Sequence, residues 1–156
     1  MSRTSARKQV TIASAYETSV VRTALAAVLV VVGIAWIAVY INVAQEAAEY
    51  IKGVGKKPSN PLPWMADLDK WNFLIGFGLI FLGLVVAAHK LTPLGRGRGV
   101  VIGMLGSFLI GLVWIVLFYF TGDSGPIPVM KDLGQYNLMV GIAFMAVGFA
   151  YATKWE

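Results

Sequence analysis

Long apolar stretches alternate along the chain with short polar ones, and the apolar stretches have the length of membrane-spanning helices. Four stretches contain no formally charged side chain when His89 is counted as neutral, namely residues 23–45, 71–89, 99–122 and 133–153. A helix needs about 20 mostly apolar residues to cross a hydrocarbon core about 30 Å thick. The pattern therefore predicts four transmembrane helices, with cores at 23–43, 71–89, 100–120 and 136–153.

Composition favours a membrane protein over a soluble domain. Hydrophobic residues make up 58% of the 156 positions and charged residues only 13%, whereas a soluble domain carries about 25% charged residues. The alternative is a soluble protein with four buried helices, but too little polar chain remains to cover them. For the first stretch, a cleaved signal peptide is the alternative. Signal peptides have apolar regions of only about 7–15 residues, so we expect an uncleaved helix.

The basic residues are distributed unevenly between the connecting segments. The N-terminal arm, the connection between the second and third stretches and the C-terminal tail carry eight Lys and Arg, whereas the other two connections carry five. Lys and Arg are retained on the cytoplasmic side of short loops. We therefore expect both termini to be cytoplasmic. The net charge of +5 then indicates attraction to anionic lipid and no nucleic-acid binding.

Two segments of the chain are nearly the same phrase, PLPWMADLDKWN at 61–72 and PIPVMKDLGQYN at 126–137. A shift of 65 residues aligns 61–91 with 126–156 and gives nine identities in 31 positions without a gap. Apolar helices often match each other by chance because they use few residue types, but the polar part of the phrase does not match so easily by chance. The phrase therefore indicates an internal duplication.

The first helices of the two halves also match, at a different shift. GIAWI at 33–37 aligns with GLVWI at 111–115 at a shift of 78, so the first outer connection contains 13 additional residues. Whether residues 44–60 extend the first helix stays open. The prediction is an all-α integral membrane protein with four transmembrane helices in two parallel-repeat hairpins, N-terminus and C-terminus inside. Its parts are a basic cytoplasmic arm, a first hairpin, a cytoplasmic linker and a second hairpin, at residues 1–22, 23–91, 92–99 and 100–156.

The repeated phrase is expected to lie at the outer membrane surface. Pro61 and Pro63 favour an extended chain before the helix. Asp67 is placed to cap the helix or lie near its N-terminus. Trp71 and Tyr136 occupy equivalent positions, where aromatic rings favour the level of the lipid headgroups.

Two asparagines close the phrase, and we expect Asn72 and Asn137 to form a hydrogen bond between the hairpins. In one interpretation the phrase only returns the chain into the membrane. In the other it also binds a partner, and its side chains form the candidate interface: Trp64, Met65, Asp67, Leu68, Trp71, Asn72, Met130, Asp132, Leu133, Tyr136 and Asn137.

Small residues recur at helical spacing in three of the predicted helices. Such stripes let helix backbones approach closely, and close packing drives helix association in lipid. Packing within the bundle is one interpretation, and docking onto a helix of another membrane protein is the other. The residues concerned are Gly99, Gly103, Ser107, Gly111, Gly76, Gly83, Gly141 and Gly148.

Residue types that support catalysis or metal binding are missing from the predicted helices. No Asp, Glu, Lys or Arg lies inside the four stretches, although proton-coupled transporters usually need one. The absence of cysteine excludes disulfides and thiolate metal sites, and GRGRG at 95–99 lacks the spacing of a phosphate-binding loop. We predict no catalytic residue, no metal site and no cofactor, and we expect that the chain is not an enzyme.

Several segments resemble the CrgA family, small actinobacterial cell-division membrane proteins also described as septation inhibitors. LIGLVWIVLFYFTG (109–122) resembles the first helix of that family, and LGQYNLMVGIAFMAVGFAYATKWE (133–156) resembles its second helix and short ending. WMADLDKWNFLIGFGLIFLGLVVAAHK (64–90) resembles the same loop and helix again, and MSRTSARKQ is similar to its basic cytoplasmic arm. The typical family member has one hairpin, whereas this chain is predicted to have two.

The resemblance implies a non-enzymatic scaffold or regulator of cell division in the plasma membrane, enriched at the septum. It implies contacts with the tubulin-like ring protein FtsZ, with other membrane division proteins and with penicillin-binding proteins, besides membrane lipids and a possible homo-oligomer. Arg3, Arg7 and Lys8 would contact acidic cytoplasmic partners or anionic lipid. A small transporter or channel-like protein with duplicated hairpins is one alternative, and a lipid-organising protein without a specific partner is another.

Overall fold

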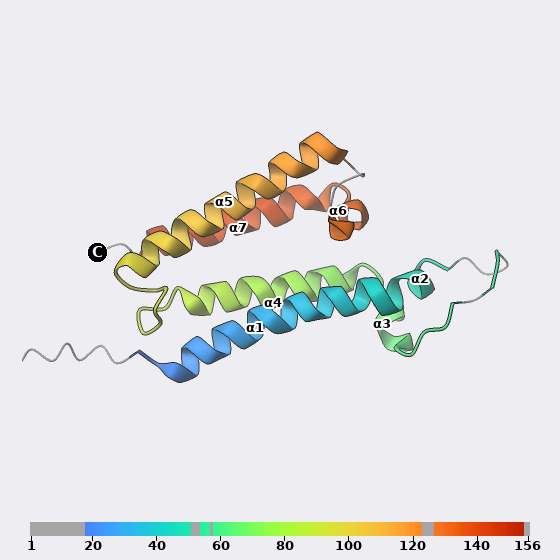
Figure 1. Ribbon diagram of the computed structural model, residues 1–156, viewed down its shortest axis with the longest axis horizontal. Helices are drawn as coiled ribbons and strands as arrows, with labels where there is room; N and C mark the ends of the chain where they lie inside the picture. Colours follow the sequence, from blue (N-terminus) through green and yellow to red (C-terminus); the bar gives the residue numbers. More distant parts are fainter. Residues whose placement is uncertain (1–17, 51–53, 57, 123–126, 155–156) are drawn as a thin grey trace, which may run out of the picture.

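The computed structural model describes residues 18–50, 54–56, 58–122 and 127–154, and these residues form helices and connections without a strand. The all-helical class predicted from the sequence is confirmed. Figure 1 shows two pairs of long helices lying side by side, α1 with α4 and α5 with α7. The elements are α1 (Val20–Val39), η1 (Tyr40–Ala44), α2 (Gln45–Ala48), α3 (Pro63–Asp67), α4 (Trp71–Ala87), α5 (Arg98–Thr121), α6 (Pro128–Leu133) and α7 (Tyr136–Ala152).

The first long helix begins at a side-chain cap and runs beyond the apolar stretch. The Ser19 hydroxyl accepts a hydrogen bond from the Arg22 N–H at 3.3 Å, which satisfies one of the free N–H groups of a helix start. After Val39 the chain makes a π-helical turn, η1, and continues as α2 to Ala48. The first part of the 44–60 segment therefore extends the first helix, a point that the sequence left open.

The four long helices differ in length. Within the described residues, Val20–Ala48 (29 residues) and Arg98–Thr121 (24 residues) are long and apolar enough to cross a membrane. The two partner helices, α4 and α7, are also apolar but have 17 residues each, the lower end of the range for a spanning helix. Only 22% and 17% of the apolar windows in the two longer helices are buried, so most of their apolar side chains face outward.

Glycines let the helices of each pair approach closely at equivalent points. A Cβ on Gly33 would lie 2.6 Å from the Gly76 carbonyl oxygen, and a Cβ on Gly111 would lie 2.5 Å from the Gly141 carbonyl oxygen. Real Cβ atoms essentially never come this close to another atom. The two pairs therefore cross in the same way, through a glycine on each helix.

The remaining small residues of the predicted stripes lie in other surroundings. Gly83 faces the Ala26 carbonyl of α1, Gly103 faces the Tyr151 ring, and Gly148 faces the Phe108 ring. Ser107 is buried in α5. Gly99 differs, because a Cβ there would meet Pro93 and Leu94 of the preceding connection and not a neighbouring helix.

The two pairs touch each other near the end that holds the 88–97 connection, and they separate toward the opposite end (Figure 1). The Phe81 and Phe144 rings pack edge to face with centroids 4.9 Å apart. The Tyr151 hydroxyl donates a hydrogen bond to the Leu84 carbonyl at 3.2 Å. These contacts join α4 to α7 over one half of their length.

Candidate functional site

Each hairpin has a short helix before its second long helix, and each short helix begins at a proline. Pro63 is the first residue of α3, and Pro128 is the first residue of α6. Proline suits this position because its fixed φ matches the helix and its missing N–H would have no partner there. The expectation of an extended chain at Pro63 is therefore wrong.

The two asparagines of the repeated phrase tie each short helix to the long helix that follows. The Asn72 side-chain amide donates to the Met65 carbonyl at 2.7 Å and to the Asp69 carbonyl at 2.8 Å. The Asn137 amide donates to the Met130 carbonyl at 2.6 Å and to the Gly134 carbonyl at 2.8 Å. Both side chains are fully buried.

These hydrogen bonds stay within one hairpin, so the expectation that Asn72 and Asn137 bond between hairpins is wrong. The tight turn after each short helix brings two carbonyl oxygens within reach of the amide, and these local acceptors use both N–H groups. Met65 and Met130 are buried by the same arrangement. The buried side chains Met65, Asn72, Met130 and Asn137 of the predicted interface therefore hold the turn between the short and the long helix in shape.

A tryptophan completes this arrangement in the second hairpin and not in the first. The Trp114 indole N–H donates to the Asn137 side-chain oxygen at 3.2 Å. At the equivalent positions, the Trp36 indole nitrogen and the Asn72 side-chain oxygen are both buried without a hydrogen-bond partner. The Trp36 ring instead packs against Trp64, with centroids 5.6 Å apart.

The turn between the short and long helices has a left-handed residue in both hairpins. Gly134 has φ +48°, and Asp69 at the equivalent position has φ +43°. Aspartate tolerates this region better than most residues, and the Asp69 carboxylate accepts a hydrogen bond from the buried Tyr40 hydroxyl at 3.4 Å. Asp67 ends α3, and no side chain caps the start of α4, so the expected helix cap at Asp67 is absent.

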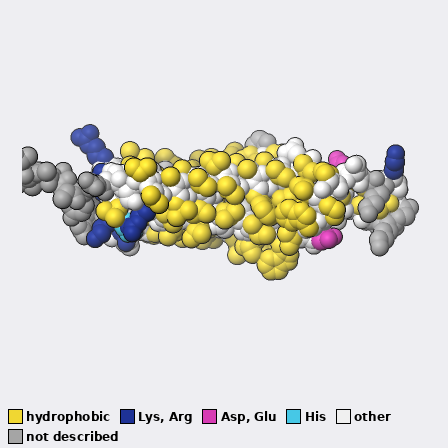
Figure 2. Space-filling model, turned by 90° about the horizontal axis from the view of Figure 1, so that it is seen from below, with side chains coloured by type: hydrophobic (Ala, Val, Ile, Leu, Met, Phe, Trp, Pro, Cys, Tyr) yellow, Lys and Arg dark blue, Asp and Glu magenta, His cyan; other side chains and the backbone are white. Residues whose placement is uncertain are grey.

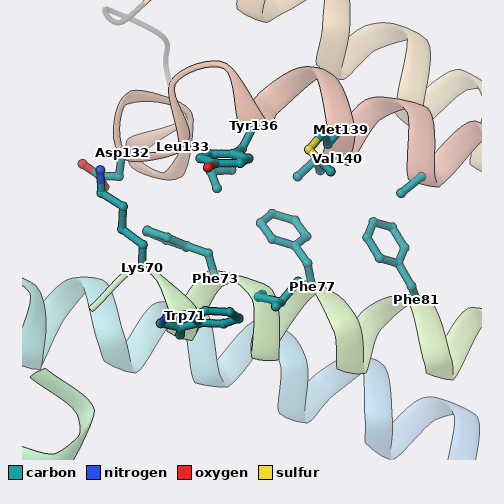
Figure 3. A pocket seen from close by; sticks show the side chains of 12 residues that line it. Lys70, Trp71, Phe73, Phe77, Phe81, Asp132, Leu133, Tyr136, Met139 and Val140 are labelled. Carbon is teal, nitrogen blue, oxygen red and sulfur yellow. The ribbon is translucent and has the colours of Figure 1, made fainter. Parts of the chain in front are cut away.

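A groove lies between the two hairpins at the end where they separate (Figure 3). Its volume is about 660 Å³, and its walls come from α4 on one side and from α6 and α7 on the other. Most of the lining side chains are aromatic or aliphatic. The lining consists of Lys70, Trp71, Phe73, Leu74, Phe77, Phe81, Asp132, Leu133, Tyr136, Met139, Val140 and Ala143.

The groove brings together four of the residues that the repeated phrase singled out. Trp71 lies on one wall, and Asp132, Leu133 and Tyr136 lie on the other. Trp71 and Tyr136 are both well exposed. Trp64 and Asp67 are exposed elsewhere on the same end of the molecule, and Leu68 is half-buried.

Sequence reasoning missed the phenylalanines of the groove. Phe73, Phe77 and Phe81 recur every four residues along α4 and line the groove. That spacing marks one face of a helix, which was the available signal. On the α7 wall, Tyr136, Val140 and Ala143 also share one helix face, but they are of mixed type in a helix that is apolar throughout, so the sequence did not indicate a shared groove.

The opposite end of the bundle is basic and tightly connected. An Arg22 guanidinium nitrogen lies 2.9 Å from Nδ1 and 2.8 Å from Nε2 of His89. The Ser19 N–H donates to the Leu91 carbonyl at 2.8 Å, and the Arg96 guanidinium donates to the Thr18 hydroxyl at 2.5 Å. The start of α1 is therefore fixed to the 88–97 connection. The predicted contact residues Arg3, Arg7 and Lys8 lie outside the described residues.

The charge distribution separates the two ends of the molecule. Figure 2 shows a broad hydrophobic band along the bundle, with several Lys and Arg gathered where the described chain begins and with acidic side chains beside a basic one toward the far end. No group of three or more metal-binding side chains occurs within the described ranges. The arrangement suits binding within or beside a membrane.

Comparisons with known proteins agree with the resemblance seen in the sequence. The model of the family "Cell division protein CrgA" matches residues 1–89 and 94–156. A cell division protein CrgA of Streptomyces avermitilis is 49% identical over 53 residues, which are 34% of this chain and 60% of that protein. The protein of the same name from Corynebacterium aurimucosum is 33% identical over 67 residues, 43% of this chain and 71% of the relative. No solved structure gives a significant match.

Proposed function

The chain belongs to the CrgA family of cell division proteins, and from this premise we propose that it is a multi-pass membrane scaffold or regulator of septum formation. It acts without catalysis, through contacts with division proteins and lipid. The observation that carries this proposal is the outward-facing apolar surface of the long helices, bounded by a basic end and by an end where acidic and basic side chains are mixed. This distribution fits a bundle that crosses the membrane and presents different charges on its two sides.

We propose that all four long helices cross the membrane, with both termini cytoplasmic. Helices α4 and α7 have 17 residues each, about 26 Å at 1.5 Å per residue, and tryptophan and tyrosine at their outer ends favour the headgroup region. Each is packed along a longer helix that meets the spanning criterion. The proposed parts remain a basic arm, two hairpins and a short linker, with the boundaries given above.

Cysteine labelling tests this topology, because the chain has no native cysteine. Gln135 and Thr153 are exposed and flank α7. Gln135→Cys is expected to react with a membrane-impermeant maleimide on intact cells, and Thr153→Cys only after permeabilisation. Ser59→Cys and Leu94→Cys form the matching pair around α4. Labelling of both members of a pair from outside would contradict a crossing by that helix.

We propose further that the chain is a tandem copy of the family hairpin. The equivalent glycine crossings, the equivalent asparagine hydrogen bonds and the two segments of the family match support this. Two linked hairpins would act as a covalent pair of the family unit. Each half would then need its partner half for the contacts at Phe81 and Tyr151.

The proposed partner surfaces lie at the two ends of the bundle. Outside, the exposed Trp64 and Asp67 are placed to meet extracytoplasmic domains, for which the resemblance suggests penicillin-binding proteins. Inside, Arg3, Arg7 and Lys8 are placed to meet acidic partners, for which it suggests FtsZ, or anionic lipid. The helix faces are available to membrane division proteins and to a second copy of the chain.

Localisation in the native cells tests the division role. A fluorescent fusion at the N-terminus is expected to form a band at nascent septa. The triple variant Arg3→Glu, Arg7→Glu and Lys8→Glu is expected to lose the band, whereas reversal of Lys52, Lys56 and Lys57 is the control of equal charge change. The Gln135 and Thr153 labels check that topology is unchanged. A uniform membrane signal from a functional wild-type fusion would contradict the proposal.

A transporter or channel remains the weaker proposal. A polar path beside Asn72 and Asn137 would favour it, but both amides are buried and bonded to backbone carbonyls. Neither asparagine lines the groove, whose walls are mostly apolar. We therefore keep the scaffold as the proposed function.

A further inference from the structure

We propose that the groove between α4 and α7 binds one phospholipid of the outer leaflet, with a zwitterionic ethanolamine headgroup at the mouth. The volume of about 660 Å³ falls in the range of small-molecule sites. The inference rests on the membrane placement proposed above, but it does not depend on a role in division.

The depth of the groove matches one leaflet. Its α4 wall runs from Trp71 to Phe81, ten residues that rise about 15 Å, which is half of a hydrocarbon core about 30 Å thick. Toward the cytoplasm the hairpins close, through the Phe81–Phe144 ring contact and the hydrogen bond from Tyr151 to the Leu84 carbonyl at 3.2 Å. Within the groove the hairpins also touch, because the Phe77 ring packs edge to face on Trp114 with centroids 5.9 Å apart. The nearly buried Phe73 and Phe77 therefore form the floor of a groove that lies in the outer half and closes toward the inner half.

This depth favours an acyl chain over a helix. A transmembrane helix of a partner or of a second copy needs about 20 residues, and only half of its length would find the groove. An acyl chain of the outer leaflet ends near the membrane midplane, where the groove ends. The side chains along its path are Phe73, Phe77 and Leu74 on α4, with Met139, Val140 and Ala143 on α7, and methionine adapts its shape to an irregular occupant.

The charges at the mouth match a zwitterion. Figure 3 shows Lys70 and Asp132 at the same end of the groove, from opposite hairpins. The Lys70 ammonium donates to a lipid phosphate, and the ethanolamine ammonium donates to the Asp132 carboxylate. An anionic glycerol headgroup would leave Asp132 without its partner.

Native mass spectrometry of the purified full-length chain tests the occupant. The chain is offered equal amounts of phosphatidylethanolamine and phosphatidylglycerol, and one phosphatidylethanolamine per chain is expected to be retained. Ala143→Phe fills the groove and is expected to abolish retention. Ile142→Phe is the control, because Ile142 is an exposed neighbour on α7 that does not line the groove.

A second variant tests the headgroup without blocking the groove. Asp132→Lys removes the carboxylate that accepts from the ethanolamine ammonium. It also adds an ammonium that attracts a second anionic group. It is expected to shift the preference toward phosphatidylglycerol by two- to fivefold, about the effect of one exposed ion pair. Equal retention of both lipids by the wild type, or unchanged retention by Ala143→Phe, would overturn the proposal.

Two further outcomes are informative. A dimer that Ala143→Phe dissociates, without retained lipid, would identify a second copy as the occupant and overturn the proposal. The cysteine labels around α7 show whether Ala143→Phe still inserts. If the labels react from the expected sides and the wild-type chain retains no lipid, the lipid site is refuted and the membrane placement stands. If the labels react from the wrong sides, the membrane placement itself is refuted.

Discussion

At single positions, the two hairpins differ in whether a polar group finds a partner. The Trp114–Asn137 hydrogen bond exists in the second hairpin, and its equivalent at Trp36 and Asn72 does not. The sequence predicted the equivalence of these residues, because GIAWI and GLVWI align. It did not predict the hydrogen bonds. Which carbonyl oxygens an asparagine amide can reach depends on the shape of the turn before the long helix, and residue spacing does not determine that shape.

This difference predicts unequal costs for the same substitution. Trp114→Phe removes the donor and leaves the buried Asn137 oxygen unpaired, whereas Trp36→Phe removes a donor that has no acceptor. Trp114→Phe is expected to lower the free energy of unfolding by about 1 kcal/mol more than Trp36→Phe. Unfolding titrations in mixed micelles measure the difference. Equal costs would contradict the assigned hydrogen bond.

His89 predicts that stability depends on pH through the basic end of the bundle. Desolvation first, and then the positive charges of Arg22 and its neighbours, lower the pKa of His89 below 6.5. Arginine only donates, so its contact with His89 requires the neutral imidazole. As the pH falls below about 6.5, the unfolded state takes up the proton first, and stability falls.

Melting curves between pH 7.5 and 5.5 measure this dependence. The stability of the wild type is expected to be fully present above pH 6.5 and to be lost progressively below it. His89→Gln keeps an acceptor without titrating in this range, so its melting temperature is expected to change less over the same interval. Parallel curves for the two proteins would show that His89 does not contribute.

At the level of elements, the length of the charge-free apolar stretches predicted the long helices well. The helices found begin and end within a few residues of the expected cores, because a charge-free stretch of that length allows little else. The short helices α3 and α6 were missed. With five and six residues, they are too short to show a hydrophobic period, and Pro63 at the start of α3 was interpreted as part of an extended chain.

The glycine crossing predicts which glycines are replaceable. A Cβ on Gly111 would clash with the Gly141 carbonyl, whereas a Cβ on Gly106 of the same helix meets nothing within 4 Å. Gly111→Ala is expected to cost about 1–3 kcal/mol through overpacking. Gly106→Ala is expected to be neutral or to stabilise, since alanine favours helix. Unfolding titrations compare the two, and a cost at Gly106 as large as at Gly111 would refute the crossing.

At the level of the whole molecule, the contact between the hairpins could not be predicted. The duplication indicated two similar hairpins, but an alignment of the two copies does not determine how they pack against each other. Phe81 meets Phe144 across the interface, and these positions are not equivalent in the alignment. The groove results from this asymmetric contact, so it could not be predicted from the repeated sequence.

Cross-linking tests the way in which the hairpins separate. Phe81→Cys with Phe144→Cys replaces two rings that are in contact, and a short bifunctional reagent is expected to join the two thiols readily. Trp71→Cys with Tyr136→Cys, across the groove mouth, is expected to react several-fold more slowly. Mass spectrometry of the intact chain measures both rates. Equal rates would mean that the hairpins are parallel throughout, without a groove.

The extension of the first helix has a consequence for any partner that touches both copies. Residues 18–22 are held beside the 88–97 connection, so the first and third long helices start at one level. The first then continues for 29 residues and the third for 24, a difference of about 7 Å in height. The end of the bundle opposite the 88–97 connection is therefore stepped. A partner that bridges the two hairpins fits this step in one orientation only, so two similar hairpins become distinguishable to it.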